Sequence, residues 1–277
     1  ALAEAARQRL PASPAPGAAG AAERLLLAQA GWLEAEALTR LHEPARAAPL
    51  ADAALAAVMT GARGSRLHGD ILSTRGGIRA ARGDTLGALR DYQAAYRIHA
   101  ASGHRRGEAL ALQHIGSIYQ DAGDYERVLD YYRQAQDAYP HDALLELSSR
   151  NNQANALDQL GRYGEAVAEY QRALALANAT GNRAAQARIL DNLAQAQLSN
   201  RAPDAAAASI GRALRLAAGQ QDSGWYPLLL GTAARVALAQ GRSAAALDHV
   251  GTALAMAGPD AETLPFRDVQ QAAYLAY

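Results

Sequence analysis

The chain has 277 residues, no net formal charge at pH 7 and a sequence pI near 7.3. Cysteine is absent, which excludes disulfide bonds and thiol chemistry. Neither the basic stripe typical of nucleic-acid binding nor a membrane-spanning run of about 20 apolar residues is evident. Alanine is abundant and all 27 basic residues are arginine, a composition that favours helix and is typical of GC-rich bacterial genomes.

Residues 1–20 are predicted to form an N-terminal arm and linker. Residues 1–10 can form a short helix, whereas residues 11–20 contain three prolines and two glycines. We interpret this segment as a poorly ordered arm, with a helix from an upstream element as the alternative. The chain begins with Ala1 rather than methionine, which is compatible with a targeting segment having been removed before it.

The segment from Ala109 to Pro140 predicts two amphipathic helices. At about 100° of rotation per residue, Leu112, Ile115, Gly116 and Tyr119 fall on one face of the first helix. Because glycine has no side chain, the second helix is expected to approach closely at Gly116. The unit ends at Pro140, since proline cannot continue a helix interior.

A tight turn separates the two helices of this segment. Gly123 is free to take positive φ and end the first helix, and Asp124 is a suitable N-cap for the second. In the second helix Val128, Tyr132 and Ala135 share one face. The turn and the two apolar faces together predict a helical hairpin.

This hairpin recurs along the chain at intervals of about 40 residues. The residues that correspond to Gly116 in each first helix are Glu36, Gly76, Gly116, Ala154, Ala194, Ala234 and Tyr274. Such a fixed period indicates a stacked helical solenoid. The recurring Tyr92, Tyr132 and Tyr170 are predicted to be core residues. The fifth turn has Arg201 instead of glycine, so its geometry is not predicted.

The pattern resembles the tetratricopeptide repeat. The characteristic positions 8, 11, 20, 24, 27 and 32 of that repeat correspond here to Gly116, Tyr119, Val128, Tyr132, Ala135 and Pro140. The 40-residue form resembles the long repeats of kinesin light chains, bacterial peptide-pheromone receptors and sensor arms of bacterial regulators.

The resemblance covers residues 21–277. It implies an all-α, right-handed superhelix of six helix pairs and the first helix of a seventh, at Phe266–Tyr277, where the solenoid is expected to be truncated. Under the same spacing the first repeat has Trp32 at position 4, and its second helix has Ala48, Asp52 and Leu55 at positions 20, 24 and 27. With Glu36 at position 8 as well, this repeat is expected to be a terminal cap with a more polar face.

No catalytic motif appears: P-loop, G-x-G-x-x-G and G-x-S-x-G patterns are all absent. No two histidines lie at helical i, i+4 spacing, so neither a metal site nor a cofactor is expected. His99 and His104 straddle the end of a helix and are interpreted as solvated surface residues. We therefore expect a protein without catalytic activity.

The resemblance also implies a binding surface, because first helices line the concave side in this family. Repeat positions 2, 5, 6, 9, 12 and 13 form this groove face. Its asparagines and glutamines both donate and accept hydrogen bonds, as a peptide backbone does. The alternative is an ordinary solvated helix face. The candidate groove residues are Gln113, His114, Ser117, Gln120, Asn151, Asn152, Asn155, Asp158, Arg188, Asp191, Asn192, Gln195 and Arg235.

The predicted function is a non-catalytic module that binds a protein or peptide. We expect it to be the sensory or regulatory arm of a larger bacterial signalling protein or transcription regulator, located in the cytoplasm, with no nucleic-acid or membrane partner for this region. Two alternatives stay open. The repeats could serve self-association as a homo-oligomer, or they could belong to an enzyme whose catalytic domain lies elsewhere.

Overall fold

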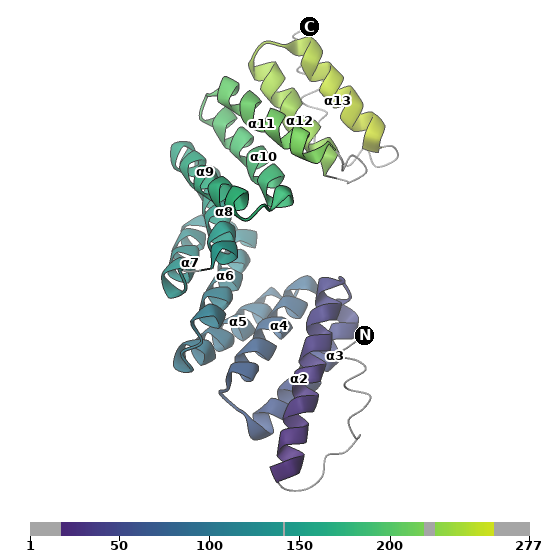
Figure 1. Ribbon diagram of the computed structural model, residues 1–277, viewed down its shortest axis with the longest axis vertical. Coiled ribbons are helices and arrows are strands. Elements are labelled where there is room, and N and C mark those ends of the chain that lie inside the picture. The colour runs from purple at the N-terminus through teal and green to yellow at the C-terminus, as the bar shows by residue number, and fades with distance from the viewer. Residues whose placement is uncertain (1–17, 141, 219–224, 258–277) are drawn as a thin grey trace. The chain divides into compact units, whose positions relative to one another are not determined.

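The computed structural model describes residues 18–140, 142–218 and 225–257, and its helices form two compact units that divide after Pro140 (Figure 1). Every regular element among the described residues is a helix, so the predicted all-α repeat fold is confirmed. None of these helices is long and apolar enough to cross a membrane.

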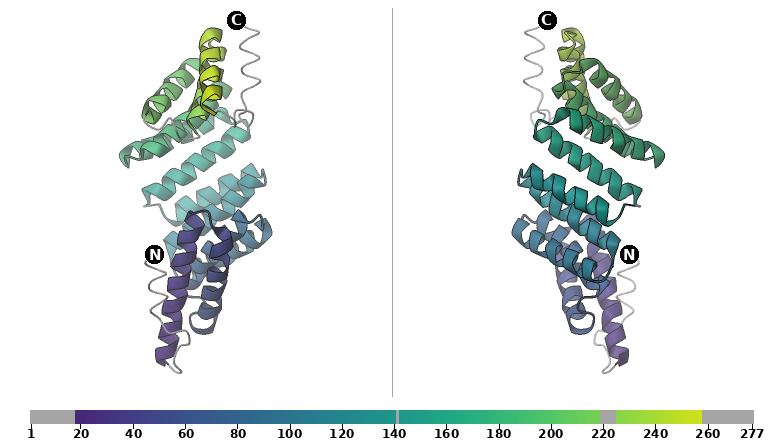
Figure 2. Two further views of the ribbon diagram at one scale, coloured as in Figure 1. Left: turned by 90° about the vertical axis from the view of Figure 1, so that its right-hand side faces the viewer. Right: turned by 90° about the vertical axis from the view of Figure 1, so that its left-hand side faces the viewer.

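Unit 1 contains three helical hairpins. Successive hairpins pack against each other, because α3 contacts α4 and α5 contacts α6. Figure 2 shows these hairpins from two sides. The helices are α2 (Ala18–Arg40), α3 (Pro44–Gly61), α4 (Arg66–Ala81), α5 (Thr85–Ala101), α6 (Arg105–Asp121) and α7 (Tyr125–Ala138).

Unit 2 repeats the arrangement, with α10 in contact with α9 and α11 in contact with α12. Its helices are α8 (Ala143–Gln159), α9 (Tyr163–Ala179), α10 (Arg183–Ser199), α11 (Pro203–Ala217), α12 (Tyr226–Ala239) and α13 (Ser243–Ala257). The six predicted helix pairs are thus present.

The turns inside the hairpins share one backbone conformation. Gly123 has φ of 75°, as predicted, and the side chain of Asp124 accepts a hydrogen bond from the Arg127 N–H at the start of α7. In the fifth hairpin Arg201 takes the same left-handed conformation with φ of 58°, and Pro203 begins α11. The missing glycine therefore leaves the turn geometry intact, at the cost of backbone strain.

In the second, third and fourth hairpins the core contains a tyrosine. Tyr92, Tyr132 and Tyr170 are 4%, 1% and 3% exposed, which confirms that they are core residues. A Cβ at Gly116 would lie 3.0 Å from Tyr132, and one at Gly76 would lie 2.6 Å from Tyr92. Glycine is needed at both positions because the ring fills the space where a side chain would begin.

The first repeat is displaced by one residue from the predicted register. Ala35 rather than Glu36 is fully buried at position 8, and Trp32 therefore takes position 5 on the groove face. The second helix buries Ala47, Ala51 and Ala54 where the sequence predicted Ala48, Asp52 and Leu55. The cause is the turn, because His42 adopts the left-handed conformation one residue earlier in the repeat than Gly83 does.

Two predicted segments lie outside the described residues: residues 1–17 of the arm and the seventh-repeat helix Phe266–Tyr277. Helix α2 begins at Ala18, inside the stretch predicted to be a linker. The proposed boundaries of the arm and of the solenoid stay predictions.

Candidate functional site

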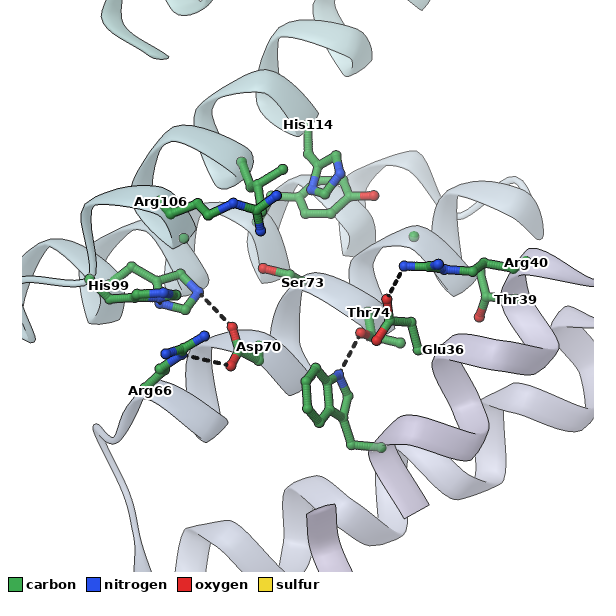
Figure 3. Close-up of a pocket in the computed structure, with 16 residues that line it drawn as sticks. Glu36, Thr39, Arg40, Arg66, Asp70, Ser73, Thr74, His99, Arg106 and His114 are labelled. Carbon is green, nitrogen blue, oxygen red and sulfur yellow. Dashed lines mark hydrogen bonds and ion pairs between the residues drawn. The ribbon is translucent and has the colours of Figure 1, made fainter. Parts of the chain in front are cut away.

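Residues of the groove face line a pocket in unit 1 and another in unit 2. We call the first the histidine pocket; it encloses about 480 Å³ and is lined by Trp32, Glu36, Asp70, Thr74, His99 and His114 among others (Figure 3). We call the second the amide pocket; it encloses about 570 Å³ and is lined by Asn151, Asn152, Asn155, Arg188, Asn192 and Trp225 among others. Most of these residues occupy positions 2, 5, 6 and 9 of their repeats.

In the histidine pocket, side chains from α2 and α4 are joined by hydrogen bonds. The indole Nε1 of Trp32 donates to Oγ1 of Thr74 at 2.8 Å, and Arg40 donates to Glu36 at 2.6 Å (Figure 3). The first of these bonds joins α2 to α4 and holds the tryptophan at the pocket wall, whereas the second lies within α2. Trp32 is at the wall only because of the register shift in the first repeat.

His99 is the most deeply buried residue of this pocket, with 1% of its surface exposed. Its Nδ1 lies 3.1 Å from Nδ1 of His104, and its Nε2 lies 3.6 Å from Oδ1 of Asp70. The prediction that His99 is a solvated surface residue is therefore wrong. The helical pattern places His99 on the core side of α5, and this burial was overlooked because a histidine at a helix end suggested solvent.

Burial controls the charge of this cluster. It lowers the pKa of His99 to about 4 and, with the nearby Arg66 guanidinium, lowers the pKa of His104. Burial raises the pKa of Asp70, and the positive charge of Arg66, 3.5 Å away, partly counteracts this rise. At neutral pH both imidazoles are therefore uncharged, beside a half-buried carboxyl group.

His114 is the predicted groove residue that lies in this pocket. Its ring centroid is 4.8 Å from that of Tyr92, and its Nδ1 is buried with no hydrogen-bond partner among the described residues. Burial lowers the pKa of His114 to about 4. Its neighbour Gln113, also a predicted groove residue, is 8% exposed and does not line this pocket.

The remaining two predicted residues of α6 do not line the pocket. Ser117 donates its hydroxyl to the carbonyl oxygen of His114 at 2.8 Å, and Gln120 is half-buried one turn further along the helix. Neither side chain lines the histidine pocket.

The amide pocket brings together four predicted asparagines from α8 and α10. Asn151 Nδ2 donates to Asn152 Oδ1 at 3.3 Å, and Asn192 Nδ2 donates to Asn155 Oδ1 at 3.4 Å. Asn155 also accepts a 2.5 Å bond from the Tyr170 hydroxyl. Asn155 therefore links α8, α9 and α10, which gives it a structural role that the sequence did not indicate.

Charged and apolar groups complete this pocket. Arg188 is exposed at one side, and Asp191 accepts a 3.1 Å bond from Gln195. Burial raises the pKa of Asp191. Trp225 and the 43% exposed Leu228 form an apolar wall at the start of α12.

Three other predicted groove residues of unit 2 lie on the same helix faces but outside this pocket. Asp158 has a buried Oδ1 atom without a hydrogen-bond partner, Gln195 is half-buried and Arg235 is exposed. They border the pocket along the helices without forming its wall.

Several residues of the two pockets were not predicted from the sequence. Asp70, Ser73 and Thr74 occupy groove positions 2, 5 and 6 of the second repeat, so the same template would have found them. Trp225 precedes α12 and was not predicted because it lies outside the helical pattern.

Comparison with known proteins identifies the repeat. Residues 67–141 and residues 147–180 each match the tetratricopeptide-repeat family. The chain contains tetratricopeptide repeats. Such repeats are protein–protein interaction modules, and solenoids of this kind bind partners on extended concave surfaces. Among curated proteins, none matches the chain by sequence.

Solved structures share the fold at low identity. A STAND signal-transduction ATPase with a tetratricopeptide repeat sensor from Pyrococcus horikoshii has 17% identity and a TM-score of 0.73; the match covers 92% of this chain and 39% of that protein. The apo form of RapI has 12% identity and a TM-score of 0.71, with 90% and 68% covered. A Podosopora anserina protein described as a kinesin light chain with TPR-like repeats has 16% identity and a TM-score of 0.58, with 69% and 96% covered.

Proposed function

We propose that this protein holds an extended segment of a partner protein in the amide pocket and works as the sensory or regulatory arm of a larger bacterial protein. The observation that supports this most is the convergence of Asn151, Asn152, Asn155 and Asn192 on one pocket of about 570 Å³. The tetratricopeptide repeats of the STAND protein are described as a sensor, which agrees with such a role.

The pocket chemistry suits a peptide backbone. Each asparagine side chain offers a carbonyl acceptor and two N–H donors, so it pairs with a backbone N–H or C=O without demanding a particular sequence. Asn151 and Asn152 are half-buried on α8, one residue apart, with part of their surface open. A bound segment can therefore exchange hydrogen bonds with them.

The edges of the pocket add selectivity. The exposed Arg188 guanidinium favours a carboxylate of the bound segment, because guanidinium pairs with carboxylate through two parallel hydrogen bonds. On the other side Trp225 and Leu228 offer an apolar surface for one side chain. The preferred segment thus combines an acidic group with an apolar residue.

A displayed library of 12-residue peptides tests the proposal. Selected peptides should bind the purified protein, and Asn152→Ala and Arg188→Ala should each weaken binding. Loss of one hydrogen bond corresponds to about 0.5–1.5 kcal/mol, which is roughly 2- to 12-fold in Kd. The matched controls are Asn178→Ala on α9 and Arg212→Ala on α11, exposed residues outside the pocket.

The proposal fails if no peptide is selected, or if selected peptides bind the pocket variants as tightly as the controls. Light scattering on the same samples addresses self-association. A dimer that dissociates when Asn152 or Arg188 is replaced, without any peptide bound, would favour the self-association alternative.

A further inference from the structure

His99 stands at a repeat position that is apolar and buried in three other repeats. The corresponding residues at the ends of α9 and α11 are Ala177 and Ala217, and Val58 of α3 corresponds under the shifted register; all three are buried. An imidazole in such a place is costly unless its nitrogens find partners. Among the described residues, its ring nitrogens lie beside His104 and Asp70.

The backbone around His99 is shaped to receive the ring. A Cβ at Gly69 would lie 2.6 Å from Cε1 of His99, and a Cβ at Gly107 would lie 2.7 Å from its Cγ. The glycines lie near the starts of α4 and α6, on helices either side of the ring. They fix the imidazole where an alanine would collide with it.

Three groups of metal-ligand type meet at this ring. One ligand atom each from Asp70, His99 and His104 lies within 4.8 Å of the other two. Ligands bound to zinc at about 2.0–2.2 Å in tetrahedral geometry are separated by roughly 3.3 Å. The 3.6 Å between Nε2 of His99 and Oδ1 of Asp70 lies near this value, whereas the 3.1 Å contact with His104 involves the other ring nitrogen of His99, Nδ1.

We infer that Asp70, His99 and His104 bind one divalent transition-metal ion of the Zn²⁺, Co²⁺ or Ni²⁺ type. Two imidazoles and one carboxylate are a ligand set suited to these ions. Three protein ligands leave coordination positions open to water or to a donor group that occupies the histidine pocket. This site is separate from the amide pocket, and the inference does not depend on the proposed function.

Binding requires a small rearrangement that the structure permits. An ion uses one nitrogen of His99, and binding at Nε2 beside Asp70 requires His104 to turn toward it. His104 is half-buried at the start of α6, and its side chain caps no backbone N–H. Arg66 competes for Asp70 from 3.5 Å, but its side chain is 68% exposed and can move into solvent.

The test is metal titration of the full chain without an affinity tag, using Zn²⁺, Ni²⁺ and Co²⁺ in separate experiments. Calorimetry should give one ion per chain, and the Co²⁺ absorption spectrum should report a nitrogen- and oxygen-bound ion. We expect His104→Ala and Asp70→Asn to weaken binding at least about tenfold each. Arg66→Ala should tighten it, because a competing cation is removed.

The matched controls are His249→Ala and Asp248→Asn in unit 2, which change the same residue types away from the cluster and should leave affinity unchanged. Circular dichroism verifies that each variant is folded. Absence of stoichiometric binding by the wild type overturns the inference. Equal affinity of wild type, His104→Ala and Asp70→Asn also overturns it, and leaves His99 as a structural core residue.

Discussion

The histidine pocket and the amide pocket use the same repeat positions to present different chemistry. In unit 1 these positions and their neighbours carry ionisable groups around a buried imidazole; in unit 2 they carry carboxamides beside an apolar wall. The two pockets also differ in their glycines. Gly69 and Gly107 enclose His99 in unit 1, whereas no glycine lines the amide pocket. The difference teaches that the repeat fixes where a pocket forms, and the side chains decide what it can bind.

Each pocket also contains one of the two tryptophans, Trp32 in unit 1 and Trp225 in unit 2. In a Trp225→Phe background, fluorescence follows unit 1, and in a Trp32→Phe background it follows unit 2. The comparison between the units can therefore be measured one unit at a time.

The largest expected effect is a loss of folding stability at low pH. Burial lowers the pKa of His114 from 6.5 to about 4, so the folded state favours the neutral ring. Above pH 6.5 the ring is neutral in both states, so the free energy of unfolding does not depend on it. Between pH 6.5 and 4 only the unfolded state binds the proton, so the free energy of unfolding falls by about 1.4 kcal/mol per pH unit, up to ~3 kcal/mol in all. In urea unfolding followed by Trp32, His114→Phe should show a correspondingly shallower loss of stability than wild type over this range. Parallel pH profiles would contradict the prediction.

The next effect concerns packing in unit 1. Gly116→Leu places side-chain atoms where Tyr132 lies 3.0 Å from a Cβ, and overpacking of this kind costs about 1–3 kcal/mol. Urea unfolding followed by Trp32 should show the loss. An unchanged midpoint would mean that the α6–α7 contact is looser than described.

A smaller loss is expected for Asn155→Ala in unit 2. It removes the acceptor for the buried Tyr170 hydroxyl, at a cost of roughly 1–2 kcal/mol. Asn151→Ala is the matched control and should change stability by less than about 0.5 kcal/mol. If Asn155→Ala, followed by Trp225, is as stable as the control, the linking role of Asn155 is wrong.

The smallest effect is a gain. Gly164 lies in α9 with open space around its Cβ position, unlike Gly116. Gly164→Ala should stabilise unit 2 by about 0.5–1 kcal/mol, because alanine loses less backbone entropy in a helix. Thermal melting measures the gain. A loss of stability would show that other atoms lie close to the Cβ position of residue 164.

The sequence predicted much of this structure because its signals are local. Helical periodicity gave the tyrosine core, and the Gly-Asp turns gave the hairpin ends, as at Gly123 and Asp124. The groove template also anticipated that Asn151, Asn152, Asn155 and Asn192 share one face, although their binding role stays a proposal.

The failures came from features that spacing cannot reveal. His42 and Arg201 adopt a backbone conformation that usually signals glycine, so the first register shifted and the fifth turn was not predicted. The place of His99 depends on Gly69, which is 30 residues away in the sequence and adjacent only after folding. Hydrogen bonds such as that from Tyr170 to Asn155 also depend on helix packing.

Each first helix has buried core positions on one face and partly exposed groove positions on the other. Positions that fill the core, such as Ala154 and Ala194, are fully buried, whereas Asn152 and Asn192, two residues earlier in each helix, keep part of their surface open. Substitutions at open positions that make no bond between helices, unlike Asn155 and Thr74, can therefore accumulate, or be introduced by design, with little disturbance to folding. Transplanting the carboxamides of α8 onto the groove positions of α4 would turn one kind of recognition surface into another while the hairpin beneath it stays the same.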